Sequence, residues 1–247
     1  MHTGTHAYIL AGGAGTRLRS LFPDTPKALV PVAGRPFLEW QLHWLAAAGV
    51  ASVRIAAGHR GRQIARWIKQ SSAARRMRVA VDIEPHPLGT GGGLHFAARV
   101  DPPGEPFLVV NGDTLLPRAD VAGFIAGACP DRGAAVAAVR VSDASRFGLL
   151  EIDADSLIRG FREKPSGGAG AVNAGVYLVH PAVLALIPES EPCSLEEEIF
   201  PLLSARGRLA GRLVSPPLLD IGTPDGLRET DEYLRRERHS LLWEPAG

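Results

Sequence analysis

The hydrophobic positions in the first half of the chain alternate between short continuous runs and longer periodic segments. The runs have the length of buried strands and cover residues 7–11, 52–57, 79–84, 107–113 and 134–141. Between the first two runs, Leu38, Leu42 and Leu45 repeat at helical spacing. This alternation predicts a largely parallel sheet that is covered by helices on both faces. Functional residues are then expected in the loops at the carboxyl ends of the strands.

The second half of the chain departs from this alternation. The sequence predicts a β-hairpin at 147–165, a buried strand at 172–181 and a charged terminal helix that begins at Pro224. Ser194 and Glu197 form the pattern of a capping box, which marks the start of another helix. No internal repeat or linker interrupts the sequence, so we expect a single domain, residues 1–247, with an elaborated second half.

The composition indicates a globular protein without an overall electrostatic preference. The 27 basic and 26 acidic residues leave a net charge of +1, so neither a nucleic acid nor a membrane is expected as a partner. Cys129 and Cys193 lie far apart without metal-ligand spacing, which favours two thiols in a reducing compartment. No apolar run approaches the roughly 20 residues that a membrane span requires. We therefore expect a cytoplasmic protein in which any anion site is local.

A glycine-rich loop follows the first apolar run. The segment LAGGAGTRLRSLFPDTPKALVPV contains the glycines Gly12, Gly13 and Gly15, and two basic residues that follow them, Arg17 and Lys27. It fits neither a Walker A loop, because no Lys-Ser/Thr pair follows the last glycine, nor a dinucleotide-binding loop, because Leu18 replaces the third glycine. Glycines let the main chain approach an anion closely, and the cations add charge. The loop favours a triphosphate over the alternative, a glycine-rich turn with solvated cations.

The whole string resembles a known family signature. G-G-x-G-T-R-L followed by P-K-x-x-x-P, from Gly12 to Pro31, resembles the signature of the sugar-phosphate nucleotidyltransferases, which make nucleotide sugars. Ala28 is a departure, because many members carry a second proline after the lysine. Further segments match in the family's order, and these are EPHPLGTGGGL, NGDT, REKP, VNAGVYL and DIGTP. The resemblance covers about residues 8–225. It implies a Rossmann-like three-layer α/β/α nucleotide-diphospho-sugar transferase fold, with a mostly parallel mixed central sheet and a small added hairpin.

The resemblance also implies a reaction between two polyanions. A sugar 1-phosphate oxygen attacks the α-phosphorus of a nucleoside triphosphate, which requires Mg²⁺ and fixed cations. Asp113 in NGDT and Asp220 in DIGTP are expected to bind Mg²⁺, although each can instead cap the turn after a strand. Arg17 is expected to contact the leaving pyrophosphate, and Lys27 the α-phosphate or the bridging region. Lys164 is expected to bind the sugar's phosphate, with a solvated loop lysine as the alternative.

Binding residues follow from the positions of the motifs. Those implied for the nucleotide are Leu10, Ala11, Gly12, Gly13, Gly15, Thr16, Glu84, Gly89, Thr90 and Gly91. A carboxylate at Glu84 can accept hydrogen bonds from N1–H and the amino group of guanine, which favours GTP, but a strand-end residue facing water is an equal alternative. Those implied for the acceptor sugar are Gly148, Glu163, Lys164, Asn173 and Glu196. Glu196 is the weakest of them, because SLEEE also makes an ordinary solvated first helical turn.

Several segments favour one subgroup of the family. The hairpin and the segments REKP, VNAGVYLVHP and SLEEEIFPLL most resemble the D-glycero-D-manno-heptose 1-phosphate guanylyltransferases, which serve the assembly of bacterial capsule and lipopolysaccharide. N-acetylmuramate 1-phosphate uridylyltransferases and mannose 1-phosphate guanylyltransferases are the alternatives. A non-catalytic nucleotide-sugar sensor is an alternative of a different class, and a NAD-binding oxidoreductase is disfavoured by the loop. The sequence leaves the formation of a homo-oligomer open.

Overall fold

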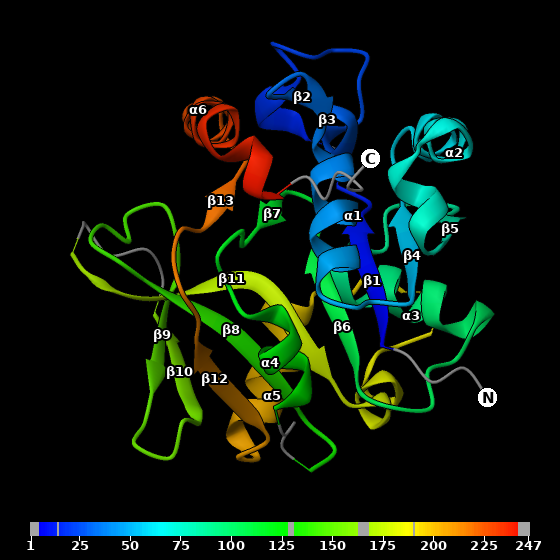
Figure 1. The fold of residues 1–247 in the computed structure, drawn as a ribbon. Coiled ribbons are helices and arrows are strands. Elements are labelled where there is room, and N and C mark those ends of the chain that lie inside the picture. The colour runs from blue at the N-terminus through cyan, green and yellow to red at the C-terminus, as the bar shows by residue number, and fades with distance from the viewer. Residues whose placement is uncertain (1–4, 14, 128–130, 163–167, 190, 242–247) are drawn as a thin grey trace.

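A nine-stranded mixed sheet forms the centre of the computed structural model, which describes the chain except for residues 1–4, 14, 128–130, 163–167, 190 and 242–247 (Figure 1). Residues 238–241 are described through their backbone alone. The strands of the sheet are β1 (His6–Ala11), β4 (Ser52–Ala57), β5 (Arg78–Ile83), β6 (Phe107–Asn111), β8 (Ala134–Val141), β9 (Leu149–Ile152), β10 (Ile158–Arg162), β11 (Gly170–Val179) and β12 (Leu209–Leu213). They lie in the order β10-β9-β11-β6-β1-β4-β5, and β8 pairs with β11 and β12.

The parallel strands β6, β1, β4 and β5 form the half of the sheet that contains the predicted βα units. All five predicted runs are strands, with ends that agree to within two residues. Side chains along β1 alternate between two buried cores, as the pleat of a strand requires. Ala7 and Ile9 pack with α1 (Phe37–Ala47) on one face, and Tyr8 packs with α3 (Gly89–Val100) on the other. Helices therefore cover both faces, and the three-layer α/β/α fold is confirmed.

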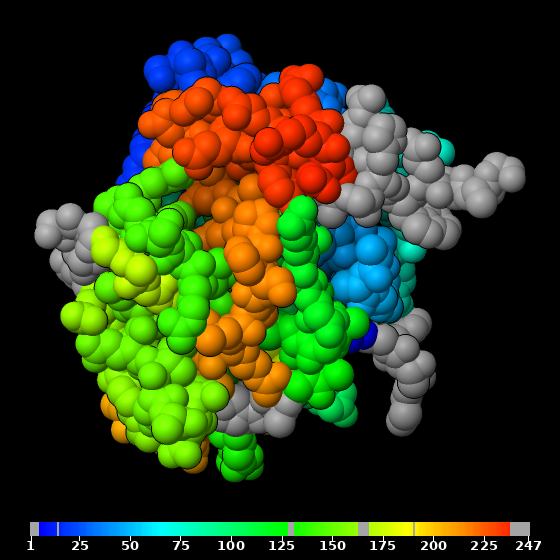
Figure 2. Space-filling model, turned by 60° about the vertical axis from the view of Figure 1, so that its left-hand side comes forward, coloured from blue at the N-terminus to red at the C-terminus, as the bar shows by residue number. Residues whose placement is uncertain are grey.

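Strand β11 joins this parallel half to an antiparallel half. It pairs antiparallel with β6, β8 and β9, and β9 pairs antiparallel with β10, so the predicted hairpin is confirmed. The segment after β12 runs along the surface between α4 (Val121–Ala126) and this hairpin (Figure 2). The central sheet is therefore mixed, as predicted, with parallel pairing around β1 and antiparallel pairing around β11.

Shorter elements connect the strands. They are the 3-10 turns Thr16–Leu18, Lys27–Leu29, Ala73–Arg76 and Pro181–Leu186, the π-helical turn Leu195–Ile199, and the helices α2 (Gly61–Gln70), α5 (Phe200–Ala205) and α6 (Pro224–Leu241). Helix α6 begins at Pro224, as the sequence predicts. Across the described part of the chain, every helix is too short or too polar to span a membrane.

The start of the π-helical turn departs from the predicted capping box in one detail. Ser194 Oγ accepts a hydrogen bond from the N–H of Glu197 at 3.1 Å, as predicted, but the carboxylate that accepts from the N–H of Ser194 belongs to Glu198, at 2.8 Å. The wider turn of a π-helix explains the difference, because it carries the next residue over the first N–H. The prediction that the Glu197 carboxylate accepts from the N–H of Ser194 is therefore wrong.

Two small ribbons complete the fold. β7 (Thr114–Leu115) directly follows Asp113 and pairs antiparallel with β13 (Leu219–Asp220), which places Asp220 opposite Thr114. The ribbon of β2 (Pro31–Val32) and β3 (Arg35–Pro36) follows the glycine loop, and helix α6 contacts both β2 and β13. The C-terminal part of the chain is thereby brought onto the loops that follow β1 and β6 (Figure 1).

Candidate active site

A cavity of about 190 Å³ opens at the carboxyl ends of β1 and β6. Its lining consists of Leu10, Ala11, Gly13, Gly15, Lys27, Ala28, Thr90, Asn111, Gly112 and Asp113. Most of these residues belong to the predicted site, whereas Ala28, Asn111 and Gly112 are additions from the structure. Thr16 and Arg17 lie on the exposed 3-10 turn beyond the glycine loop. The structure therefore brings the glycine loop, Lys27 and Asp113 together around one cavity, as a parallel sheet of this kind predicts.

Lys27 and the two predicted metal-binding aspartates come together from three distant segments: Lys27 and Asp113 line the cavity, and Asp220 lies near both of them outside its lining. Lys27 Nζ forms an ion pair with Asp113 Oδ2. The main-chain oxygen of Asp113 accepts a hydrogen bond from the N–H of Ile221 at 3.0 Å, which fixes the loop that carries Asp220. Burial and the nearby negative charge of Asp113 raise the pKa of Asp220, while a hydrogen bond from the N–H of Gly222 opposes that rise. The two carboxylates are thus close enough to repel each other.

The two aspartates fit a magnesium ion on chemical grounds. Carboxylate oxygens are the ligands that Mg²⁺ prefers, and this ion is commonly held by one or two carboxylates, with water and phosphate completing its shell. In the part of the chain that the structure describes, no group of three or more His, Cys, Asp and Glu residues could hold a metal ion. A pair without further protein ligands suits Mg²⁺ bound together with phosphates, and does not suit a closed structural site such as that of zinc.

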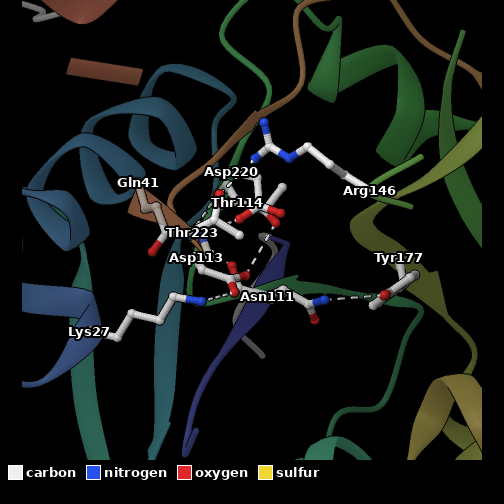
Figure 3. A network of polar contacts seen from close by, with 10 residues as sticks. Lys27, Gln41, Asn111, Asp113, Thr114, Arg146, Tyr177, Asp220 and Thr223 are labelled. Atoms are coloured by element: carbon white, nitrogen blue, oxygen red, sulfur yellow. Dashed lines mark hydrogen bonds and ion pairs between the residues drawn. The ribbon is translucent and has the colours of Figure 1, made fainter. Parts of the chain in front are cut away.

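Arg146 reaches the aspartate pair from the loop before β9 and was missed by the sequence reasoning. Its Nη2 donates to Thr223 Oγ1 at 3.1 Å, and its Nη1 lies 3.3 Å from Glu229 Oε2. The guanidinium charge also opposes the rise in the pKa of Asp220 that burial and Asp113 cause. Figure 3 shows Lys27 and Arg146 approaching from opposite sides. Nothing in the sequence distinguishes Arg146 from a solvated loop arginine, because its partners lie about 80 residues further along the chain.

Glu84 is buried beneath the glycine loop, with 7% of its surface exposed. Its Oε2 accepts a hydrogen bond from the N–H of Leu88 at 3.2 Å. A Cβ placed on Gly12 would lie 2.5 Å from Oε1, and one placed on Gly93 would lie 2.8 Å from it, so both backbones pack directly on the carboxylate. Burial raises the pKa of Glu84. The alternative of a strand-end residue facing water is therefore wrong, and contact with a guanine base stays a prediction.

Of the predicted nucleotide-binding residues at the start of α3, some contact the protein and one faces the cavity. The N–H of Gly91 donates to the main-chain oxygen of Cys193 at 2.8 Å, so this group is already used within the protein. Gly89 lies exposed beside the same segment. Thr90 lines the cavity, donates through Oγ1 to Glu196 Oε2 at 2.5 Å and accepts from the N–H of Leu195 at 2.8 Å. The glycines here pack against the protein, whereas Thr90 faces the cavity.

The predicted sugar residues Asn173 and Glu196 meet at Tyr177, which the sequence reasoning did not select. Asn173 Nδ2 lies 3.1 Å from the Tyr177 hydroxyl, and that hydroxyl lies 3.0 Å from Glu196 Oε1. Glu197 is exposed, as a solvated first turn predicts, but Glu196 turns inward. The solvated alternative for Glu196 is therefore wrong. Tyr177 occupies an apolar position of a buried strand, and no sequence signal separates it from ordinary core packing.

One supporting residue and three predicted sugar-binding positions remain. Gln41, on α1, was missed by the sequence reasoning; it donates through Nε2 to the main-chain oxygens of Asn111 and Thr114, at 2.9 and 2.8 Å, and so fixes the NGDT turn. Gly148 is exposed, two residues after Arg146, and is not part of the cavity lining. Glu163 and Lys164 lie outside the described residues, so their expected contacts with the sugar phosphate stay predictions.

Comparison with known proteins gives a consistent assignment. The family model described as Nucleotidyl transferase matches residues 6–237. The mannose-1-phosphate guanylyltransferase catalytic subunit beta of Drosophila pseudoobscura is 34% identical over 225 residues, which are 90% of this chain and 60% of that protein. The mannose-1-phosphate guanyltransferase of Candida albicans is 36% identical over 235 residues, which are 92% of this chain and 64% of that protein. The chain thus spans somewhat less than two thirds of these two curated relatives.

A solved structure matches over nearly its whole length. The crystal structure of HddC from Yersinia pseudotuberculosis superposes with a TM-score of 0.83 at 30% identity, covering 93% of this chain and 99% of that one. HddC complexed with GMP-PN superposes with a TM-score of 0.82. Both solved structures and the family model thus cover most of this chain. The chain belongs to the nucleotidyl transferase family.

Proposed function

We propose that this protein transfers a guanylyl group from GTP to a sugar 1-phosphate, giving a GDP-sugar and pyrophosphate. The observation that carries the proposal is the convergence of Lys27, Asp113 and Asp220 beside the glycine loop. Two neighbouring carboxylates and a lysine beside one cavity suit a reaction between two polyanions, because such a reaction depends on positioning and on charge compensation. Membership of the nucleotidyl transferase family supports the same reaction class.

Each group at the cavity has a proposed task. Gly12, Gly13 and Gly15 follow β1 and offer main-chain N–H groups to the triphosphate. Lys27 supplies a fixed positive charge at the α-phosphate, and Arg17 compensates the charge of the departing pyrophosphate. Asp113 and Asp220 would hold Mg²⁺, which when bound compensates phosphate charge between the two substrates. No group of the protein is required as a covalent nucleophile, because the sugar phosphate oxygen attacks the α-phosphorus directly.

Guanine is the proposed base for two reasons. The curated relatives of 34% and 36% identity are guanylyl transferring enzymes by name, and HddC has been solved with GMP-PN. Because the chain spans less than two thirds of those relatives, their activity supports a proposal for this chain and does not establish it. The uridylyl alternative has no comparable support among these proteins.

The proposed acceptor is a sugar 1-phosphate of manno configuration. We favour D-glycero-D-manno-heptose 1-phosphate, because the hairpin and the segments around Asn173 and Glu196 resemble the heptose guanylyltransferases. Mannose 1-phosphate is the second candidate, since the curated relatives carry that activity in their names. The two sugars share the configuration of the ring, and the heptose has one more carbon in the side chain outside the ring. The favoured acceptor assigns the product to the assembly of surface polysaccharides.

A pyrophosphate-release assay tests this proposal. The protein is supplied with Mg²⁺, with GTP or UTP, and with heptose, mannose, glucose or N-acetylmuramate 1-phosphate. Pyrophosphate release with GTP and a manno-configured acceptor is the expected result. Whichever of heptose 1-phosphate and mannose 1-phosphate gives the larger kcat/KM is the assigned acceptor. Release only with UTP and N-acetylmuramate 1-phosphate would transfer the assignment to the uridylyl class. Tight binding of a nucleotide sugar without release from any pair would identify a sensor.

A further inference from the structure

The hydroxyl of Tyr177 lies at the centre of a buried polar cluster beside the cavity. Tyr177 is fully buried on β11. A carboxylate can only accept, so the hydroxyl donates its proton to Glu196 Oε1 at 3.0 Å. Its two lone pairs then face the Nδ2 groups of Asn173, at 3.1 Å, and Asn111, at 3.4 Å. One hydroxyl therefore uses its whole hydrogen-bonding capacity to connect three side chains (Figure 3 labels Asn111 and Tyr177).

A bulge in β11 makes this meeting possible. In a regular strand, residues 173 and 177 are roughly 13 Å apart, at about 3.3 Å per residue. Here Asn173 pairs with Ala138 and Tyr177 pairs with Val136, so four steps along β11 correspond to two along β8. Gly175 sits within the bulge with φ of 66°, a conformation that favours glycine. The bulge turns Asn173 back toward the Tyr177 hydroxyl, as bulges near functional sites commonly do.

The cluster fixes the direction of both asparagine amides. Asn173 Oδ1 accepts from the N–H of Gly175 at 2.9 Å, which confirms that Nδ2 points to Tyr177. With the Nδ2 group of Asn111 also directed at Tyr177, the opposite atom, Oδ1, is buried and has no partner among the described residues. Asn111 lines the cavity. This acceptor lies behind the cavity wall, and buried polar groups otherwise have partners, so the Asn111 amide is only partly satisfied by the cluster.

Glu196 is held from both sides. Oε1 accepts from Tyr177, while Oε2 accepts from Thr90 Oγ1 at 2.5 Å and from Ser194 Oγ at 3.3 Å. Thr90 also lines the cavity, so two partners of the cluster, Thr90 and Asn111, face the same space. Burial and the charge of Glu196 raise the pKa of Tyr177, which keeps its hydroxyl protonated as the donor. The carboxylate is thus positioned before any substrate arrives.

We propose that Tyr177 is a positioning residue for the acceptor sugar, and that its hydroxyl sets sugar specificity by holding Glu196, Asn173 and Asn111 in one arrangement. This proposal rests on the proposed function, since it assigns the cluster to the sugar 1-phosphate half of that reaction. Tyr177 itself is buried and does not line the cavity. It acts through its partners, of which Asn111 lines the cavity directly and Glu196 contacts Thr90, which also lines it.

Tyr177→Phe tests this role, and Tyr8→Phe is a matched control. Both tyrosines are buried on central strands and pack edge-on against a phenylalanine, Tyr177 against Phe200 at 4.8 Å and Tyr8 against Phe107 at 5.1 Å between ring centroids. Each variant keeps the ring and removes one hydroxyl. The Tyr8 hydroxyl donates to the main-chain oxygen of Asp101 at 3.0 Å, and neither residue belongs to the cavity lining. The two variants are therefore matched in ring, burial and atoms removed, although the Tyr177 hydroxyl has three partners and the Tyr8 hydroxyl one, so denaturation of both variants is measured as well.

The measurements are KM and kcat for both substrates, and the ratio of kcat/KM for mannose 1-phosphate to that for glucose 1-phosphate. Tyr177→Phe is expected to raise the KM for sugar 1-phosphate about tenfold and to lower the ratio by a similar factor, with the KM for GTP within about twofold of wild type. Tyr8→Phe is expected to change none of them. An unchanged ratio in Tyr177→Phe, or equal changes in both variants, would overturn the proposal.

Two further readouts separate this proposal from the proposed function. Calorimetric titration with mannose 1-phosphate measures sugar binding without turnover, so weaker binding in Tyr177→Phe alone supports the positioning role even if no pyrophosphate is released. If the wild type is active and Tyr177→Phe leaves sugar binding unchanged, the positioning role is overturned and the proposed function stands. Glu196→Gln, alone and combined with Tyr177→Phe, shows whether Tyr177 acts through Glu196. If Tyr177 acts through Glu196, the double variant should bind sugar 1-phosphate no more weakly than the single variant with the lower affinity. If the two residues act independently, the fold losses in affinity of the single variants should multiply in the double variant.

Discussion

Lys27 and Asp113 form an ion pair at the wall of the cavity, although 86 residues separate them in the chain. Their side chains are 20% and 31% exposed. An ion pair this accessible to solvent contributes at most about 1 kcal/mol to stability, so structural need does not explain its position. The pair instead places a fixed cation and a carboxylate at the point where, in the proposed reaction, phosphate and Mg²⁺ meet. Removing either charge should therefore affect turnover far more than folding.

Asp113→Asn is expected to lower kcat by at least about 10²-fold, because the proposed metal site loses one of its two carboxylates. The free energy of unfolding should change by less than about 1 kcal/mol, since the lost ion pair is partly exposed. Steady-state pyrophosphate release and chemical denaturation measure the two effects. Asp153→Asn is the control, because Asp153 is similarly exposed, at 26%, and pairs with Arg159 in the hairpin turn. Equal turnover in the two variants would remove Asp113 from the metal site.

Contiguous motifs explain how much of this site could be predicted from the sequence. Lys27, Asp113 and Asp220 each stand in a short string of fixed spacing, and the alternation of strands and helices places such strings at one edge of the sheet. No sequence motif identifies Tyr177 as a functional residue, because any large residue that packs well suits its position in a buried strand. Its role depends on a bulge and on Glu196, which the fold supplies from outside that strand.

Glu84 shows a second limit of sequence reasoning. The sequence places it at the end of a strand, and both sequence interpretations, base contact and exposure to water, treat its carboxylate as accessible. The structure packs the backbones of Gly12 and Gly93 onto that carboxylate. Burial at this position depends on how the start of α3 lies against the glycine loop, which is a tertiary relationship between segments about 80 residues apart. Local patterns contain no information on it.

Gly12 and Gly13 should respond differently to the same substitution. A Cβ at Gly12 would lie 2.5 Å from the buried Glu84 carboxylate, whereas a Cβ at Gly13 would meet no atom within 4 Å. Gly12→Ala is therefore expected to lower the free energy of unfolding by about 1–3 kcal/mol through overpacking, and to raise the KM for GTP. Gly13→Ala should leave stability within about 0.5 kcal/mol of wild type. Denaturation curves for both variants test the contrast, and equal destabilisation would contradict the packing of Glu84 under Gly12.

Glu84 should also make stability dependent on pH. Burial raises its pKa, so the folded protein keeps a proton at Glu84 in a pH range where the unfolded chain has lost it. Stability from this group is therefore fully present below the ordinary value of 4.5 and declines as the pH rises through the folded pKa. Glu84→Gln stays neutral, so its Tm relative to wild type should increase with pH above 4.5. Thermal melts in a pH series measure this difference.

A control at a solvated carboxylate completes that experiment. Glu197 is exposed, and Glu197→Gln removes a negative charge without removing a buried one. Its Tm relative to wild type should stay nearly constant over the same pH series. A constant difference for Glu84→Gln as well would show that Glu84 is not desolvated in the folded protein, and would contradict its position beneath the glycine loop.

Arg146, in the loop before β9, is expected to contribute to turnover. It contacts Thr223 and Glu229 at the start of α6, and its charge lies close enough to oppose the rise in the pKa of Asp220 that burial and Asp113 cause. Arg146→Gln removes a fixed cation from the edge of a site where two polyanions are proposed to meet, so kcat should fall about tenfold or more. Stability should change by less than about 1 kcal/mol, because the ion pair with Glu229 is exposed. Arg228→Gln is the matched control, since Arg228 is exposed on α6 and pairs with Asp225 and Glu232. If both variants keep the kcat of wild type, the charge of Arg146 has no part in turnover, and its contacts serve only to connect the loop to α6.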